Sequence, residues 1–190
     1  MRLEPAQLAA HNEPLLDRHQ RRLEALRQET NRADGIVERL IDFQIAIPSW
    51  ALGAGGTRFG RFSGGGEPRN LDEKIEDVGL LHALSRSAGA ISLHIPWDIP
   101  DDPARIRALA EGLDIRFDAV NSNTFQDQPG QTLSYKFGSL QHIDPAVRRM
   151  AVAHNIEVIR HGEALGSESI TVWLADGSCF PGQLNFREAF

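Results

Sequence analysis

Cysteine is almost missing from this sequence, in which Cys179 stands alone among 190 residues. A single cysteine excludes an internal disulfide framework and any cysteine-based zinc cluster. Long apolar runs are missing as well, whereas a membrane-spanning helix needs about 20 consecutive apolar residues. The segment that begins at Met1 also lacks the apolar core of a secretion signal. These absences predict a cytoplasmic protein with no membrane partner.

An excess of basic residues is lacking too, because the formal net charge is −6. An acidic chain binds polyanions poorly unless its basic residues cluster. The densest basic cluster, Arg18, Arg21 and Arg22, lies in a predicted helix that also carries Asp17 and Glu24. This mixture is typical of a solvated helix face, so we expect no nucleic-acid partner.

Helical and extended patterns alternate along the chain. Amphipathic leucine spacing predicts an N-terminal helical extension over residues 1–43. The remainder, 44–190, contains predicted strands at 44–50, 90–98, 115–123 and 169–176, and predicted helices at about 71–87, 103–113 and 145–165. The last of these helices has Pro145 in its first turn and Gly166 after its end. Four βα units in series predict an α/β fold with parallel strands.

The faces of the predicted strands decide between two architectures, an open doubly wound sheet and a barrel. In segment 90–98, Leu93 and Ile95 share one face, while Ser92, His94 and Pro96 share the other. Strands covered by helices on both faces usually form continuous apolar runs. One apolar face and one polar, aromatic face therefore favour a (β/α)8 TIM barrel with an inner functional surface.

Four strands make only part of such a barrel, which takes about 250 residues when complete. They would leave two parallel edges unpaired, and exposed edges promote aggregation. We therefore expect an incomplete barrel, the N-terminal half of a longer protein. Association of two half-barrels is the alternative.

Three of the predicted strands carry a tryptophan at the carboxyl end, namely Trp50, Trp97 and Trp173. Parallel α/β folds build their sites at the carboxyl ends of strands, where aromatic rings pack against the C–H faces of sugars. The alternative is that these rings fill the barrel mouth as core. His94, on the inner face, either moves a proton or binds a substrate hydroxyl, or is a buried histidine that only bonds its neighbours.

Polar residues at the predicted strand ends offer further candidates. Asn121 and Asn123 share a face and suit sugar hydroxyls, or satisfy loop backbone. Asp98 and Asp176 are possible supporting acids, although Asp176 before a glycine is also an ordinary turn residue. A hard divalent cation needs several converging oxygen ligands. Because no such cluster is visible in the sequence, we predict no metal ligands within this chain.

A glycine-rich stretch, residues 53–66, fits neither nucleotide-binding template. Its glycines do not follow the dinucleotide-binding spacing, and no Gly-Lys-Ser/Thr sequence is present. We interpret the stretch as a lid or a subunit-contact arm that docks through Phe59 and Phe62.

Six strings, in order, resemble the broad-specificity bacterial L-rhamnose isomerases, which belong to the xylose isomerase-like barrels. The resemblance runs from about residue 10 to Phe190. The strings are Ile47-Pro-Ser-Trp, Gly55-Gly-Thr-Arg-Phe, Ser92-Leu-His-Ile-Pro-Trp-Asp, Asn121-Ser-Asn-Thr-Phe, Ser134-Tyr-Lys-Phe-Gly-Ser-Leu, and Thr171-Val-Trp with Asp176-Gly-Ser and Phe180-Pro-Gly-Gln.

This resemblance implies interconversion of L-rhamnose and L-rhamnulose and of related monosaccharides, with divalent manganese and a homotetramer. It implies that His94 acts in ring opening and that Trp50, Phe125 and Trp173 line the substrate pocket. It also implies that Phe59 reaches the pocket of a neighbouring subunit. The family's metal ligands begin at the end of the fifth strand, which lies beyond this chain.

Two other classes stay open at this stage. One is a non-catalytic carbohydrate-binding or assembly module made of a half-barrel. The other is a different xylose isomerase-like enzyme, an endonuclease or an epimerase, although those enzymes cluster His and Glu ligands at several strand ends and this chain does not.

Overall fold

The structure, a computed structural model, describes residues 4–53, 55–57, 60–62, 64–174, 185 and 187, and for 55–57 and 60–62 it describes the backbone alone. The helices are α1 (Pro5–Glu29), α2 (Ala33–Ile41), α3 (Ser49–Leu52), α4 (Leu71–Ser85), α5 (Pro103–Gly112) and α6 (Pro145–Leu165). The strands are β1 (Ala46–Pro48), β2 (Gly55–Thr57), β3 (Gly60–Phe62), β4 (Ala90–Ser92), β5 (His94–Ile95), β6 (Arg116–Phe117), β7 (Val120–Ser122) and β8 (Ile170–Val172).

The strands outside the glycine-rich stretch pair in parallel and in chain order. β1 pairs with β4, and β4 pairs with β6. β5, which continues the segment that contains β4, pairs with β7, and β7 pairs with β8. In the second sheet His94 is in register with Asn121, and Asn121 is in register with Thr171. Parallel pairing in chain order agrees with the βα alternation predicted from sequence.

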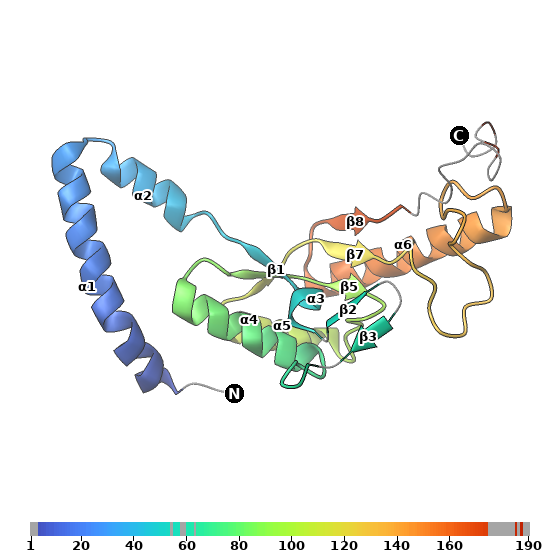
Figure 1. The fold of residues 1–190 in the computed structure, drawn as a ribbon, viewed down its shortest axis with the longest axis horizontal. Helices are drawn as coiled ribbons and strands as arrows, with labels where there is room; N and C mark the ends of the chain where they lie inside the picture. Colours follow the sequence, from blue (N-terminus) through green and yellow to red (C-terminus); the bar gives the residue numbers. More distant parts are fainter. Residues whose placement is uncertain are drawn as a thin grey trace.

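An arm formed by α1 and α2 extends away from the α/β body, as Figure 1 shows. α1 has no buried residue, which agrees with its polar composition. It touches the body through Asn12, whose Nδ2 donates to the carbonyl of Ala83 at 3.2 Å. Among the described residues, no helix combines the length and the apolarity needed to cross a membrane.

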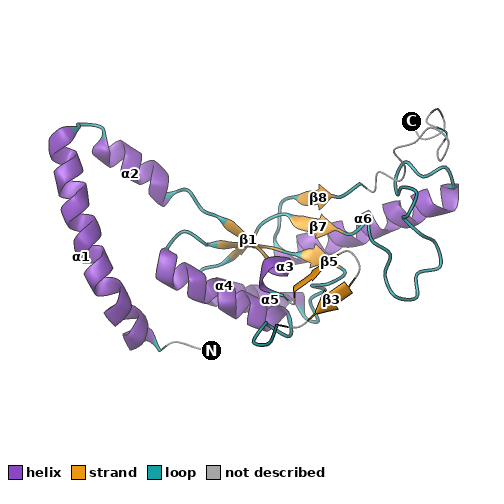
Figure 2. Ribbon diagram, in the orientation of Figure 1, coloured by secondary structure: helices purple, strands orange, loops and turns teal. Residues whose placement is uncertain are grey.

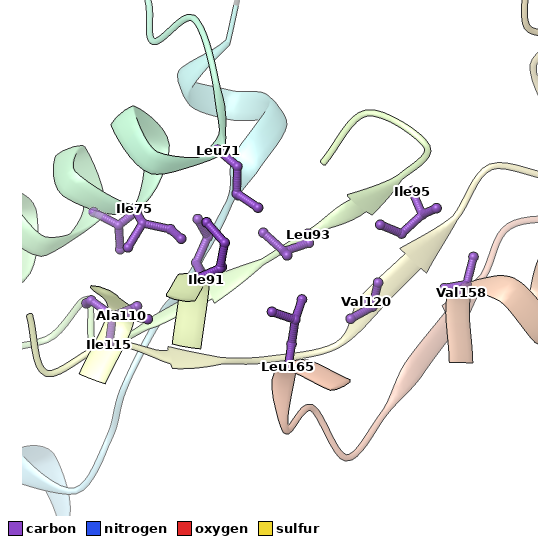
Figure 3. Packing of buried hydrophobic residues seen from close by; sticks show 12 residues of the cluster. Leu71, Ile75, Ile91, Leu93, Ile95, Ala110, Ile115, Val120, Val158 and Leu165 are labelled. Carbon is purple, nitrogen blue, oxygen red and sulfur yellow. The ribbon is translucent and has the colours of Figure 1, made fainter. Parts of the chain in front are cut away.

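The apolar row of the second predicted strand forms the centre of the core. Ile91, Leu93 and Ile95 are fully buried, and they pack with side chains from α4, α5 and α6 (Figure 3). α4 lies beside α5 and α5 beside α6, so the helices cover this face of the strands (Figure 2). The alternation in the sequence therefore predicted the helix-facing row, and it leaves Ser92 and His94 on the opposite face.

Helix ends follow local sequence signals. α6 begins at Pro145 and ends before Gly166, whose φ of 79° is left-handed, as predicted. α4 ends at Ser85, two residues earlier than predicted, because Arg86 adopts a left-handed φ of 59°. The first strand also differs: it was predicted to reach Trp50, but β1 stops at Pro48 and α3 begins at Ser49. The backbone leaves the strand at Ser49, whose hydroxyl donates a hydrogen bond to the buried carboxylate of Asp98.

The helix cap at Asn70 provides a first test. Its Oδ1 accepts a hydrogen bond from the backbone N–H of Glu73 at 3.0 Å. We expect Asn70→Ala to lower the free energy of unfolding by about 1 kcal/mol, because the first turn of α4 loses that acceptor. Urea denaturation measures the change. Asn70→Ser is the matched control, since serine keeps an acceptor oxygen; equal losses in both variants would show that the cap is not the cause.

The glycine-rich stretch contains an antiparallel hairpin. Gly55 pairs with Phe62, and Thr57 pairs with Gly60. The interpretation of this stretch as a lid or contact arm stays a prediction. Of its two proposed docking groups, Phe59 lies outside the described residues, and Phe62 is described in its backbone alone.

Candidate functional site

Five aromatic rings gather just beyond the carboxyl ends of the strands, and we call Trp50, His94, Trp97, Phe125 and Trp173 the aromatic cluster. Trp50 lies in α3 directly after β1, Trp97 follows β5, and Trp173 follows β8. Phe125 follows β7 by three residues. Parallel pairing brings these strand ends to one edge of the body, which is why residues from separate segments meet there.

His94 occupies the centre of the cluster. Its ring stacks on Trp97 with centroids 3.9 Å apart and planes 15° apart. Trp50 meets it edge-on at 5.5 Å, and Phe125 does so at 5.8 Å. Phe125 in turn lies 5.9 Å from Trp173. The structure thus brings together three of the substrate-binding residues predicted from sequence and the predicted catalytic histidine.

Exposure divides the cluster into a covered centre and open faces. His94 is 3% exposed, whereas Trp50, Phe125 and Trp173 are 37%, 40% and 47% exposed. Large apolar rings left open on one edge mark a place where something binds. The arrangement suits a ligand that has both apolar C–H faces and hydroxyls, because a ring platform surrounds a histidine with hydrogen-bonding capacity.

Trp97 stacks on the histidine but was not among the substrate-binding residues predicted from sequence. A turn after β5 places it there: the backbone N–H groups of Trp97 and Asp98 both donate to the carbonyl of His94, at 2.8 and 3.0 Å. Sequence did mark Trp97 as one of three tryptophans at strand ends. The stacking of its ring on His94 could not be predicted from the sequence, because it depends on the geometry of the turn.

The far side of the cluster is fixed by hydrogen bonds between strands. The Trp173 indole Nε1 donates to Asn121 Oδ1 at 3.1 Å, and Asn121 Nδ2 donates to the carbonyl of Leu93 at 3.0 Å. Thr124 Oγ1 donates to the carbonyl of Trp173. Asn121, a sequence candidate for binding hydroxyls, is 5% exposed and orients Trp173 instead.

Asn123, the second asparagine candidate, is occupied in the same way. Its backbone N–H donates to His154 Nε2 at 3.1 Å, and its Nδ2 donates to the carbonyl of Gln126 at 3.1 Å. It therefore organises the loop that carries Phe125. The alternative in which the asparagines satisfy loop backbone describes their observed contacts.

The loop after Phe125 has a carboxylate at its centre. Asp127 accepts hydrogen bonds from the Ser134 hydroxyl at 2.6 Å and the Tyr135 backbone N–H at 2.7 Å. Tyr135 packs with Val147 and Ala151 of α6. Burial raises the pKa of the Tyr135 phenol, and the nearby Asp127 charge raises it further. Tyr135 therefore stays neutral and anchors the loop to α6.

The carboxylate of Asp98 lies buried next to the cluster. Oδ1 accepts from Lys74 Nζ at 2.5 Å, and Oδ2 accepts from the His94 backbone N–H at 2.8 Å. Oδ2 also accepts from the Ser49 hydroxyl. Asp98 is 2% exposed, so both oxygens are satisfied within the protein. Lys74 gave no signal in the sequence, because it lies in the first turn of α4, 24 residues before its partner.

Metal binding has no support within the described part of the chain. There, no group of three or more His, Cys, Asp or Glu side chains is arranged to hold a metal ion. Asp98 is held by Lys74, Ser49 and the His94 backbone. The residues that the structure describes therefore do not form a manganese site. Asp176, a predicted supporting acid, lies outside the described residues.

One cavity of about 450 Å³ lies at the opposite edge of the strands, where Gly89 precedes β4 and Ile115 precedes β6. Its lining also includes His82 and Asp114 but no member of the aromatic cluster. Functional sites of parallel α/β folds lie at the carboxyl ends of the strands. The aromatic cluster is thus the stronger candidate for the substrate site.

The Trp173 hydrogen bond can be tested directly. We expect Trp173→Phe to lower the free energy of unfolding by about 1 kcal/mol, because the buried Asn121 Oδ1 loses its indole donor. Thermal unfolding followed by circular dichroism measures the change. Trp50→Phe is the control, since the Trp50 indole nitrogen makes no hydrogen bond to the residues described. A loss in the control as large as in Trp173→Phe would assign the effect to ring size.

The fold and the cluster define a parallel α/β protein segment with an aromatic and histidine site at the carboxyl ends of its strands. No family model matches the chain. The chain is 52% identical over 157 residues to a probable sugar isomerase of Rhizobium meliloti (strain 1021), and 53% identical over 157 residues to a probable sugar isomerase of Mesorhizobium japonicum. Each match covers 83% of this chain and 36% of the relative. The chain thus spans about a third of the length of the relatives it matches.

Proposed function

We propose that this chain is part of an aldose–ketose sugar isomerase of the L-rhamnose isomerase type, which interconverts L-rhamnose and L-rhamnulose and related sugars. The observation that carries the proposal is the aromatic cluster around His94. It coincides with the strings that resemble this family, and the chain is similar to proteins named as probable sugar isomerases over 83% of its length. The structure and the relatives support sugar chemistry; the rhamnose preference rests on the resemblance.

We further propose that the body is the first part of a (β/α)8 barrel, with residues 1–43 as an extension. Two observations support this architecture. The parallel strands pair in chain order, without the reversal of strand order that marks a doubly wound sheet. Helices α4, α5 and α6 pack on the apolar row of the strands, which leaves the row of His94 free to face a lumen.

In this proposal each site residue predicted from the sequence has a role. His94 transfers a proton or binds the ring oxygen during sugar ring opening. Trp50, Phe125 and Trp173 provide the platform for the sugar. Phe59 reaches the site of a neighbouring subunit in a homotetramer. The family resemblance implies that manganese ligands come from outside this chain, and the described residues form no cation site. The single cysteine fits action in the cytoplasm.

The experiment uses a chimera in which this chain replaces the matched 157-residue segment of the Rhizobium meliloti relative. We expect the purified chimera, with manganese, to convert L-rhamnose to L-rhamnulose at a rate similar to the intact relative. Ketose formation measures turnover, with D-allose as a second substrate. A folded chimera without turnover, beside an active relative, would contradict the assignment of this site. Turnover of D-allose but not L-rhamnose would contradict the rhamnose preference.

A second candidate function is a non-catalytic carbohydrate-binding or assembly module. The observation that favours it is that the described residues supply an aromatic platform without a cation site. Binding of L-rhamnose by the 190-residue chain alone, in the presence of a chelator, and an inactive chimera would support the module. Turnover by the chimera would reject it.

A further inference from the structure

A pair of opposite charges lies buried beside the aromatic cluster, on the side of α4. The side chain of Asp98 is 1% exposed and that of Lys74 is 12% exposed, with Nζ and Oδ1 2.5 Å apart. Taking two charges out of water is costly, and well-packed apolar residues often serve stability equally well. Stability alone therefore does not account for this pair.

The contacts of the pair suggest what it does. Asp98 accepts hydrogen bonds from Lys74 of α4, from Ser49 of α3 and from the His94 backbone of β5. These three elements are separated along the sequence, and the single carboxylate of Asp98 forms hydrogen bonds with all of them. Hydrogen bonds to a charged group are shorter and stronger than neutral ones, so the carboxylate restrains each donor at a defined distance.

Two of the three donors belong to or adjoin a ring of the cluster, and the carboxylate itself follows a third ring. Ser49 precedes Trp50, so its hydroxyl fixes the start of α3 and with it the edge contact of Trp50 on His94. The bonded N–H belongs to His94 itself. Asp98 follows Trp97, the ring that stacks on His94. Lys74 holds the other carboxylate oxygen from α4 and thereby fixes the carboxylate.

We propose that Asp98, anchored by Lys74, is a positioning residue that sets the mutual geometry of Trp50, His94 and Trp97 and so the affinity of the cluster for a monosaccharide. The consequence for sugar binding rests on the function proposed above; the geometric part does not. Asp98 does not touch the substrate and donates no proton. It acts through the three rings, because the residues that bind a ligand must themselves be held in place, within a fraction of an ångström, by supporting residues behind them.

The test compares four forms of the 190-residue chain: wild type, Asp98→Ala, Ser49→Ala and Arg105→Met. Arg105 of α5 is the control. Its Nη1 lies 2.5 Å from Oδ2 of Asp72, which belongs to α4 like Lys74, but this ion pair is exposed to solvent. Ring contacts are measured as NMR nuclear Overhauser effects between His94 and the two tryptophans. Near-ultraviolet circular dichroism reports aromatic packing, far-ultraviolet dichroism reports folding, and tryptophan fluorescence titration with L-rhamnose reports binding.

For Asp98→Ala we expect loss of both His94–tryptophan contacts, with the helical signal retained and affinity for L-rhamnose weakened by about tenfold or more. Ser49→Ala removes only the α3 donor, so we expect loss of the Trp50–His94 contact while Trp97 stays stacked on His94. Arg105→Met should leave all ring contacts and the affinity unchanged. A purely structural role would not produce this selective loss in Ser49→Ala.

Retention of both ring contacts in folded Asp98→Ala would overturn the proposal. If Asp98→Ala does not fold, Ser49→Ala decides, because an intact Trp50–His94 contact in that variant also overturns it. If wild type does not bind L-rhamnose, the proposed function loses its support, while the ring contacts still decide the positioning role. If Asp98→Ala keeps both ring contacts but binds L-rhamnose more weakly, that result also contradicts the positioning role.

Discussion

Replacing His94 with glutamine in the chimera is expected to lower kcat for L-rhamnose by about 10²–10⁴-fold, the usual contribution of one general acid–base group. Glutamine keeps hydrogen-bonding capacity but does not exchange a proton near neutral pH. We therefore expect KM to change little, because the tryptophan and phenylalanine platform remains. Steady-state ketose formation measures both constants.

The control for this prediction is His161→Gln. His161 lies on α6, where it is 3.9 Å from Glu157, and it takes part in none of the ring contacts that define the cluster among the described residues. Its replacement should leave turnover unchanged. If His94→Gln keeps the wild-type kcat, His94 is a buried histidine that serves packing and hydrogen bonding, which is the alternative that the sequence left open.

Replacing Lys74 with methionine is expected to lower the free energy of unfolding by about 3–5 kcal/mol. The reason is that Asp98, 2% exposed, would remain a buried carboxylate without its countercharge, and removal of one partner from a buried pair has this cost. Urea denaturation followed by circular dichroism measures it. The exposed pair of Arg105 with Asp72 gives the comparison, because solvent screens such a pair and its loss should change stability far less.

The double variant Lys74→Met/Asp98→Asn separates charge from packing. It removes both charges, while the asparagine oxygen still accepts from Ser49 and His94. We expect it to regain most of the stability lost in Lys74→Met. A double variant as unstable as the single one would show that the packing of the lysine stem, and not an unpaired charge, causes the loss.

Local features of this fold were readable from the sequence because they depend on neighbours within one or two turns of chain. Pro145 and Gly166 mark the ends of α6 through fixed or left-handed backbone angles. The alternation of Leu93 and Ile95 with His94 follows from the two-residue period of a strand, and it predicted which row packs on the helices. The half-barrel architecture goes further than these rules and stays a prediction.

The composition of the candidate site was readable only in part. The sequence predicted one site for His94, Trp50 and Trp173, because His94 lies on the inner face of a strand, both tryptophans lie at strand ends, and all three match the family resemblance. Their contacts did not follow, because Trp97 reaches His94 through a turn, and Trp50 reaches it through a short helix where a strand was predicted.

The sequence by itself determined the α/β order, the ends of α6 and the candidate rings, since each depends on short-range backbone preferences and side-chain periodicity. Only the tertiary structure decided that Lys74 is the partner of Asp98 and that Asn121 orients Trp173, partners 24 and 52 residues apart. Such pairs depend on strand register and on how a helix is seated against the sheet. Those are properties of the packed chain, and no local pattern encodes them.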